Sequence, residues 1–211
     1  MDQNEIYRMR KEFFNNHAEM WMDMWYKDPA TGRHDAYAEQ FARLFSMVEL
    51  KPGDNVLDTG CGVGVLVPFI LDRITDTGLL YEVDYAAKMI EVNRRRHPQP
   101  NIRFLVADVA DMPVKEGGCD VAFCFSCFPH FHDKAAALTA LAAALRKGGT
   151  LAIAHFDSSE GINKHHSGCM AVMHDTLPTG GEMRSLCSEA GFIIETFIDE
   201  PGFYALIADK A

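Results

Sequence analysis

The sequence predicts a three-layer α/β fold: a seven-stranded, mostly parallel sheet with helices on both faces. From residue 55 onward, short apolar segments alternate with segments of helical spacing, the pattern of repeated strand–helix units. A glycine-rich loop follows the first apolar segment, as expected where a parallel strand turns into a helix. Near the C-terminus, the turn sequence Asp199-Glu200-Pro201-Gly202 separates two apolar segments, which predicts a closing antiparallel hairpin.

The chain before the sheet is predicted to be helical. Residues 5–26 carry aromatic and methionine side chains at helical spacing, among them Phe13, Trp21 and Trp25. The sequence Asp28-Pro29-Ala30-Thr31-Gly32 ends this segment, and a second helix is expected over residues 34–49. The aromatic stripe has two interpretations: a lid over a bound ligand, which we favour, or packing on the sheet.

Boundary signals mark the elements that follow. Gly78 opens the second strand, Pro98 closes the helix before the third, and Asp133 is placed to cap the helix after the fourth. Thr179 and Glu182 have the spacing of a capping box. The predicted strands are 55–59, 79–84, 102–107, 119–125, 150–156, 192–198 and 203–209. The predicted helices are 63–75, 86–97, 134–146, 159–171 and 180–190.

Composition limits the class of protein. A chain of 211 residues with 48% hydrophobic and 24% charged residues is expected to form one globular domain. The net charge of −10 argues against binding to nucleic acid or to an anionic membrane. No segment is apolar enough to span a bilayer and the N-terminus does not resemble a signal peptide, so we expect a cytoplasmic protein without membrane insertion.

Cysteine and histidine do not form a recognisable metal site. Six cysteines in such a chain are expected to be reduced, and the Cys124-Phe125-Ser126-Cys127 stretch lies in an apolar segment, which favours packing over redox or zinc chemistry. A set of polar side chains between residues 165 and 175 matches no established ligand spacing: His165, Cys169, His174 and Asp175. We therefore expect no metal.

The glycine loop is built to receive a nucleoside with a positively charged tail. The segment Val56-Leu57-Asp58-Thr59-Gly60-Cys61-Gly62-Val63-Gly64 joins a buried strand to a Gly-x-Gly-x-Gly loop, where the backbone can approach a ligand closely. The dinucleotide pattern requires a glycine where Val65 stands. Asp58 would repel a pyrophosphate and attract a cation, which disfavours an NAD-dependent oxidoreductase.

Acidic residues also follow the next two strands. Asp84 could accept hydrogen bonds from both ribose hydroxyls, or it could cap the helix that starts at Ala86, and one side chain can do both. Asp108 could accept from an adenine amino group while the neighbouring backbone N–H donates to the ring; its other interpretation is a local turn cap. One acid at each successive strand end is a more specific signal than the glycines alone.

These motifs resemble the class I S-adenosylmethionine-dependent methyltransferases, the broad group that includes the ubiquinone and menaquinone biosynthesis methyltransferases. Besides the glycine loop and the segments at Asp84 and Asp108, the matching segments are Asp120-Val121-Ala122-Phe123 and Leu145-Arg146-Lys147-Gly148-Gly149-Thr150-Leu151. One departure is the absence of a proline before Gly148-Gly149. The resemblance spans roughly residues 52–156, with the motifs in the family's order.

The resemblance implies a Rossmann-like fold, S-adenosyl-L-methionine as methyl donor and S-adenosyl-L-homocysteine as product. The glycine loop would hold the methionine moiety, Asp84 the ribose and Asp108 the adenine. The residues expected to bind the cofactor are Asp58, Gly60, Cys61, Gly62, Gly64, Asp84, Tyr85, Met89, Asp108, Val109 and Phe125.

The same resemblance implies how the single domain, residues 1–211, is organised. Residues 1–50 would form a helical lid, 52–156 the cofactor-binding core, 157–191 a variable segment facing the acceptor, and 192–211 the hairpin. The implied reaction is in-line methyl transfer to a small-molecule acceptor that the sequence does not name. A non-catalytic sensor or partner subunit that binds the same cofactor is the alternative, and a homodimer stays open.

Histidines are candidates for catalysis and for contact with the acceptor. His130 follows the fourth strand and is the catalytic candidate, either as a base or as a group that orients the acceptor. Its other interpretation is a loop histidine that covers the adenine or caps the next helix. His155 could line the pocket or pack at the end of its strand. The candidates for the acceptor side are Phe13, Trp21, His130 and His155.

Overall fold

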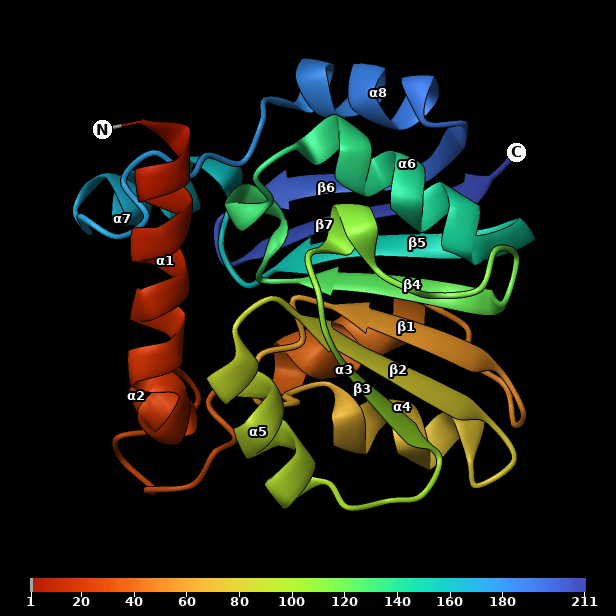
Figure 1. The fold of residues 1–211 in the computed structure, drawn as a ribbon, viewed down its shortest axis with the longest axis horizontal. Coiled ribbons are helices and arrows are strands. Elements are labelled where there is room, and N and C mark those ends of the chain that lie inside the picture. Colours follow the sequence, from red (N-terminus) through yellow and green to blue (C-terminus); the bar gives the residue numbers. More distant parts are fainter. Residues whose placement is uncertain (1) are drawn as a thin grey trace.

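Seven strands form one mixed sheet at the centre of the molecule, in the order β3-β2-β1-β4-β5-β7-β6 (Figure 1). The computed structural model describes residues 2–211. The strands are β1 (Asn55–Thr59), β2 (Leu79–Asp84), β3 (Ile102–Val106), β4 (Cys119–Phe125), β5 (Leu145–His155), β6 (Phe192–Glu200) and β7 (Phe203–Lys210). The strands β1 to β5 are parallel to one another, whereas β7 is antiparallel to both β5 and β6. The predicted seven strands and closing hairpin are confirmed.

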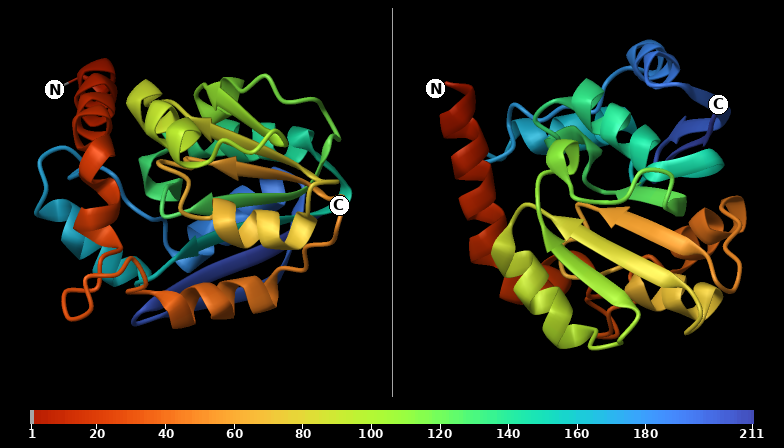
Figure 2. Two further views of the ribbon diagram at one scale, coloured as in Figure 1. Left: turned by 90° about the horizontal axis from the view of Figure 1, so that it is seen from below. Right: turned by 45° about the vertical axis from the view of Figure 1, so that its right-hand side comes forward.

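Helices cover both faces of the sheet, as predicted (Figure 2). On one face, α3 (Ala38–Met47) and α4 (Val67–Ile74) pack apolar side chains against β1, β2, β4, β5 and β7. On the other face, α6 (Lys134–Ala144) and α8 (Gly180–Glu189) close a second core. The helix α5 (Ala87–Arg96) packs on β2 and β3, whereas α7 (Ser159–Ser167) lies beside the N-terminal segment, where Trp25 packs on His165 (Figure 1). The predicted caps are present, because Asp133 accepts from the Ala136 N–H and Thr179 forms a capping box with Glu182.

The N-terminal segment stands across the carboxyl ends of the parallel strands (Figure 1). It is not the single helix predicted over residues 5–26, because α1 (Gln3–His17) gives way to a 3-10 turn, η1 (Ala18–Met20), before the short α2 (Trp21–Trp25). Asp2 caps α1 in a capping box with Glu5. Polar contacts fasten the segment to α5: Asn15 accepts from the Lys88 N–H at 2.9 Å, and Glu19 pairs with Arg95.

Other helix boundaries differ from prediction by several residues. The helix expected over 34–49 begins only at Ala38, because residues 34–37 form turns. The helix expected from residue 63 begins at Val67, because the glycine loop continues through Gly64, whose φ is +82°. No helix within residues 2–211 is long and apolar enough to cross a membrane.

Candidate functional site

A pocket lies at the carboxyl ends of the parallel strands, beneath the N-terminal segment. Its empty volume is about 850 Å³, including space open to solvent, which is the size of a small-molecule site. Ten of the predicted cofactor residues line it: Asp58, Gly60, Cys61, Gly62, Asp84, Tyr85, Met89, Asp108, Val109 and Phe125. The structure therefore brings together residues from four strand ends.

Gly64 does not line this pocket. A Cβ atom at Gly64 would lie 2.2 Å from the Asn93 side-chain oxygen and 2.7 Å from the His97 ring. Together with its φ of +82°, this shows that Gly64 lets the loop pack closely on α5. Gly64 therefore shapes the loop through its packing on α5 and does not contact the pocket.

Two loops interlock at the floor of the pocket. Ser126, directly after β4, has a φ of +53°, which is strained for a residue with a side chain. Cys127 donates from Sγ to the Thr59 carbonyl at 3.0 Å, and a Cβ atom on Gly60 would lie only 2.4 Å from the Cys127 Cβ. Glycine is thus required where the β1 and β4 loops touch, and Cys127 has the packing role that its apolar context predicts.

Three acidic side chains are buried at the centre of the site without a cation. Asp58 is 2% exposed, and burial followed by the nearby Glu82 raises its pKa well above the usual range. Burial also raises the pKa of Glu82 to about 8 and that of Asp84 to about 6. Within residues 2–211, no ion pair involves any of the three. Because an unpaired buried charge is costly, the site suits a cationic ligand.

Asp84 organises the backbone around it. Its Oδ2 accepts from the Gly62 N–H at 2.9 Å and its Oδ1 accepts from the Ala86 N–H at 2.8 Å. The helix cap that the sequence left open is absent, because α5 begins at Ala87 with Ala86 as its N-cap and no side chain caps it; the Asp84–Ala86 hydrogen bond only closes the turn before the helix. These hydrogen bonds favour the ionised carboxylate, but burial outweighs them in setting its pKa.

Asp108 lies where the N-terminal helix closes over β3. Its Oδ2 accepts from the Tyr7 hydroxyl at 3.1 Å, and its Oδ1 accepts from the Ala110 N–H at 3.0 Å. Burial and the Asp108 charge raise the pKa of Tyr7 to about 12, so the phenol stays protonated and donates. Tyr7 therefore closes this end of the pocket.

Aromatic side chains from the N-terminal segment form one wall. Phe14, Trp21 and Tyr26 line the pocket, and the Phe14 and Trp21 rings lie 5.6 Å apart. Phe13, predicted on this side, does not line it, because its ring packs against His17 at 4.3 Å. On a helix, one position changes the direction of a side chain by about 100°.

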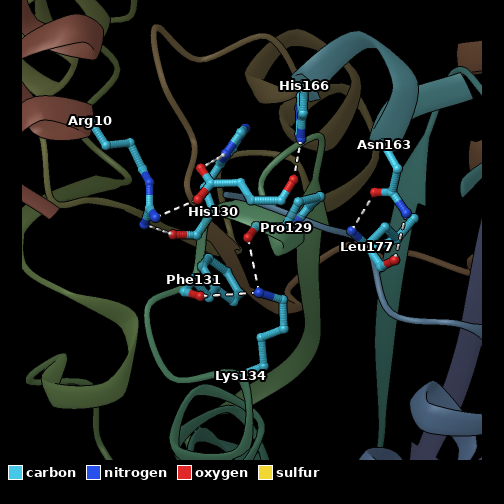
Figure 3. A network of polar contacts seen from close by, with 9 residues as sticks. Arg10, Pro129, His130, Phe131, Lys134, Asn163, His166 and Leu177 are labelled. Atoms are coloured by element: carbon cyan, nitrogen blue, oxygen red, sulfur yellow. Dashed lines mark hydrogen bonds and ion pairs between the residues drawn. The ribbon is translucent and has the colours of Figure 1, made fainter. Parts of the chain in front are cut away.

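His130 lines the pocket and belongs to a polar network (Figure 3). Its Nδ1 lies 2.7 Å from Oδ2 of Asp175, whose other oxygen pairs with Arg10 of α1. Arg10 also donates to the His130 carbonyl at 2.5 Å. The His166 ring lies 4.9 Å from that of His130, and its Nδ1 is 2.7 Å from the Asp175 carbonyl. Among the described residues, no group of three or more His, Cys, Asp or Glu is placed to hold a metal.

His155 is buried behind the pocket and does not line it. Its ring packs edge-on against Tyr204 at 5.9 Å. Burial, with nearby His130 and His166, lowers the pKa of His155 to about 3, so the ring is neutral. This arrangement matches the packing interpretation.

Several residues of the site were not predicted from sequence: Tyr7, Arg10, Phe14, Tyr26, Glu82 and Asp175. A signal existed for three of them, because Tyr7, Arg10 and Phe14 are spaced i, i+3 and i+7 and so share one helix face. For Asp175 there was none, since it lies in an irregular segment and meets His130 only through the fold.

Comparisons with known proteins agree on one family. Residues 56–149 match a family model described as a methyltransferase domain. A 2-phytyl-1,4-naphtoquinone methyltransferase of Trichormus variabilis is 38% identical over 76 residues, 34% of this chain and 33% of the relative, so the match spans a third of that protein's length. O-methyltransferase rstn1 of Aspergillus nomiae is 25% identical over 87% of this chain and 82% of its own.

The fold of the chain is shared with solved methyltransferase structures. The crystal structure of a SAM-dependent methyltransferase from Aquifex aeolicus superimposes with a TM-score of 0.67 at 16% identity, over the whole length of both chains. The family match covers the glycine loop and the three strand-end acids, which surround one pocket. By its motifs and its family match, the segment 56–149 is a methyltransferase domain, and the chain as a whole has the fold of the class I S-adenosylmethionine-dependent methyltransferases.

Proposed function

We propose that this chain transfers the methyl group of S-adenosylmethionine to a small-molecule acceptor. The observation that carries the proposal is the set of Asp58, Asp84 and Asp108 around one pocket, with two of these acids buried and unpaired. The printed names of the relatives, a naphthoquinone methyltransferase and an O-methyltransferase, support a small acceptor.

In this proposal, different residues of the pocket bind different parts of the donor. Asp58 and the backbone of Gly60 and Gly62 face the cationic methionine end, Asp84 faces the ribose hydroxyls, and Asp108 faces the adenine amino group. The buried acids fit this donor because its positive charge would supply the counter-ion that Asp58 lacks, and its ribose hydroxyls would donate hydrogen bonds to Asp84. When bound, the sulfonium supplies an already activated methyl group.

The chain then has to align the acceptor and exclude water. Phe14 and Trp21 provide apolar walls that hold an acceptor and keep solvent out, and His130 lines the same space. His130 acts there as a base or as a group that orients the acceptor. In-line displacement at the sulfonium methyl needs these groups on the side of the methyl opposite the sulfur.

We also propose a role for each segment of the chain. Residues 1–50 act as the lid, 52–156 hold the cofactor, 157–191 face the acceptor and 192–211 complete the sheet. The contact of Arg10 with Asp175 supports the pairing of lid and acceptor segment, because it joins the two directly. We place the protein in the cytoplasm, acting on a small molecule and not on nucleic acid.

Two measurements on the full chain test the proposal. Calorimetry should show stoichiometric binding of S-adenosylhomocysteine, and labelled donor should pass its methyl group to a small molecule in a cell extract. Asp58→Asn should weaken product binding at least about tenfold and reduce methyl transfer, whereas Asp72→Asn, at an exposed carboxylate on α4, should change neither. Binding without transfer would identify a sensor or partner subunit, and failure of the product to bind would refute the proposal.

A further inference from the structure

We propose that Asp175 is a positioning residue: it holds the neutral His130 ring with Nδ1 protonated and Nε2 free, so that Nε2 takes the proton of an acceptor hydroxyl during methylation. This inference rests on the proposed function and adds the class of acceptor. The acceptor would carry a hydroxyl group, such as a phenol, that is protonated near neutral pH.

The contact between Asp175 and His130 fixes the tautomer. A carboxylate can only accept, so the 2.7 Å contact requires a proton on Nδ1. Asp175 is 2% exposed and its other oxygen is held by Arg10, which prevents the carboxylate from turning away from the ring. The ring has little freedom to exchange its two nitrogens.

The second nitrogen of the ring is available for chemistry. No described residue hydrogen-bonds to His130 Nε2, and this nitrogen is not among the enclosed polar atoms, although the side chain is only 14% exposed. His130 lines the cofactor pocket beside Phe14, whose ring lies 5.2 Å away. An unpartnered Nε2 in this pocket is placed to receive a proton.

Burial keeps the ring neutral. It lowers the pKa of His130 and outweighs the Asp175 carboxylate, which raises it, while Arg10 and Lys134 add smaller lowering effects. His166 packs on the same ring and His155 lies behind it; both have lowered pKa values themselves, chiefly through burial. Because burial outweighs Asp175, the His130 ring is a free base at neutral pH.

The proposed step balances without another reactant. The acceptor oxygen forms a bond to the methyl carbon as the carbon–sulfur bond breaks, and the bonding electron pair stays on sulfur. The hydroxyl proton moves to Nε2 of His130 and returns to solvent after the products leave. An aryl thiol such as thiophenol, already largely ionised at neutral pH, would need this base far less.

Asp175→Asn tests the positioning directly, because the amide has one acceptor and one donor end. Arg10 requires the oxygen, so the amide NH2 faces Nδ1 of His130 and the proton moves to Nε2. Long-range proton–nitrogen spectra of histidine-labelled protein with S-adenosylhomocysteine should show an Nδ1-protonated His130 in the wild type and an Nε2-protonated one in the variant. The His130→Gln spectrum assigns the signal.

Rates of methyl transfer to two probe acceptors test whether the His130 tautomer affects turnover. Asp175→Asn should slow transfer of labelled methyl to catechol at least about tenfold, with transfer to thiophenol changed less than about threefold. Asp133→Asn is the matched control, since asparagine caps a helix as well as aspartate and this side chain only caps α6. Its spectra and rates should match those of the wild type.

Each outcome has one meaning. An Nε2-protonated His130 in the wild type, or an unchanged tautomer in Asp175→Asn that still binds the product, overturns the inference. Equal slowing with catechol and thiophenol would overturn it as well, since a merely structural defect affects both acceptors. Failure of the wild type to bind S-adenosylhomocysteine would instead refute the proposed function itself.

Discussion

Tyr7 in α1 donates its phenolic proton to Asp108 at the end of β3, 3.1 Å away and 101 residues along the chain. Almost one helical turn later, Arg10 pairs with Asp175 and donates to the His130 carbonyl. Two neighbouring positions of one helix thus contact the expected adenine end of the pocket and the segment beside the candidate base. The N-terminal helix joins the two halves of the site.

Tyr7→Phe should loosen this helix. The change removes one hydrogen bond to a carboxylate and leaves the ring in place, so we expect a loss of about 1 kcal/mol in the free energy of unfolding. Urea unfolding of the ligand-free protein measures it. Tyr81→Phe is the control, because the half-buried Tyr81 packs against the core. Equal losses in the two variants would show that the Tyr7–Asp108 bond does not stabilise the fold.

Asp58→Asn should stabilise the ligand-free protein while weakening donor binding. Burial raises the pKa of Asp58, so the folded state binds its proton more tightly than the unfolded state. Stability from this group is present at acid pH and falls as pH rises above the unfolded value of about 4. An amide has no charge to bury, so the variant should unfold at a higher temperature than the wild type at pH about 8, by an amount that shrinks toward pH about 4.

The same Asp58→Asn variant, although more stable, should bind the ligand more weakly. Affinity for S-adenosylhomocysteine, measured by calorimetry, should fall at least about tenfold, because the ligand's ammonium group loses its buried partner. Asp72→Asn on the exposed side of α4 should leave both stability and affinity as they are. A variant that is less stable than the wild type at every pH would contradict the assignment of Asp58 as an uncompensated buried acid.

Alanine substitutions at two glycines of the loop should have different effects, one mainly on stability and the other mainly on ligand binding. Gly64→Ala drives a Cβ atom to 2.2 Å from the Asn93 oxygen at a φ of +82°, so we expect a loss of about 3 kcal/mol or more. Gly62→Ala meets only the Trp21 indole nitrogen at 4.0 Å, so it should fold with a cost of about 1 kcal/mol. Because Gly62 lines the pocket, its variant should bind S-adenosylhomocysteine poorly; normal binding would place the ligand away from this loop.

The sheet could be predicted from sequence because each of its signals is local. Strands β1, β2 and β4 begin and end where their apolar runs do, and the turn after Glu200 sets the closing hairpin. The cofactor side of the pocket follows from the same logic, since parallel strands deliver their carboxyl ends to one edge. Ten of the predicted residues meet there for that reason.

The acceptor side could not be predicted in the same way. The Asp175–His130 pair joins residues 45 apart through an irregular segment, and no period or motif records such a contact. The prediction of which side of the N-terminal helix faces the pocket was also wrong by one residue, since Phe14 lines the pocket and Phe13 does not. The aromatic stripe alone does not say which of two neighbouring residues points inward. The break at residues 18–20 changes the inward-facing side again.

Trp21→Ala should weaken ligand binding, whereas Trp25→Ala should not. Trp21 lines the pocket beside Phe14, so its indole is placed to pack against an adenosyl or sulfonium group, a contact worth about 1 to 2 kcal/mol, or roughly tenfold in affinity. Trp25 is 38% exposed, lies next to Trp21 and packs on His165 outside the pocket. Calorimetric titration with S-adenosylmethionine, which carries the sulfonium, compares the two directly. If both variants bound like the wild type, the N-terminal segment would pack on the sheet without acting as a lid, which is the interpretation that the aromatic stripe left open.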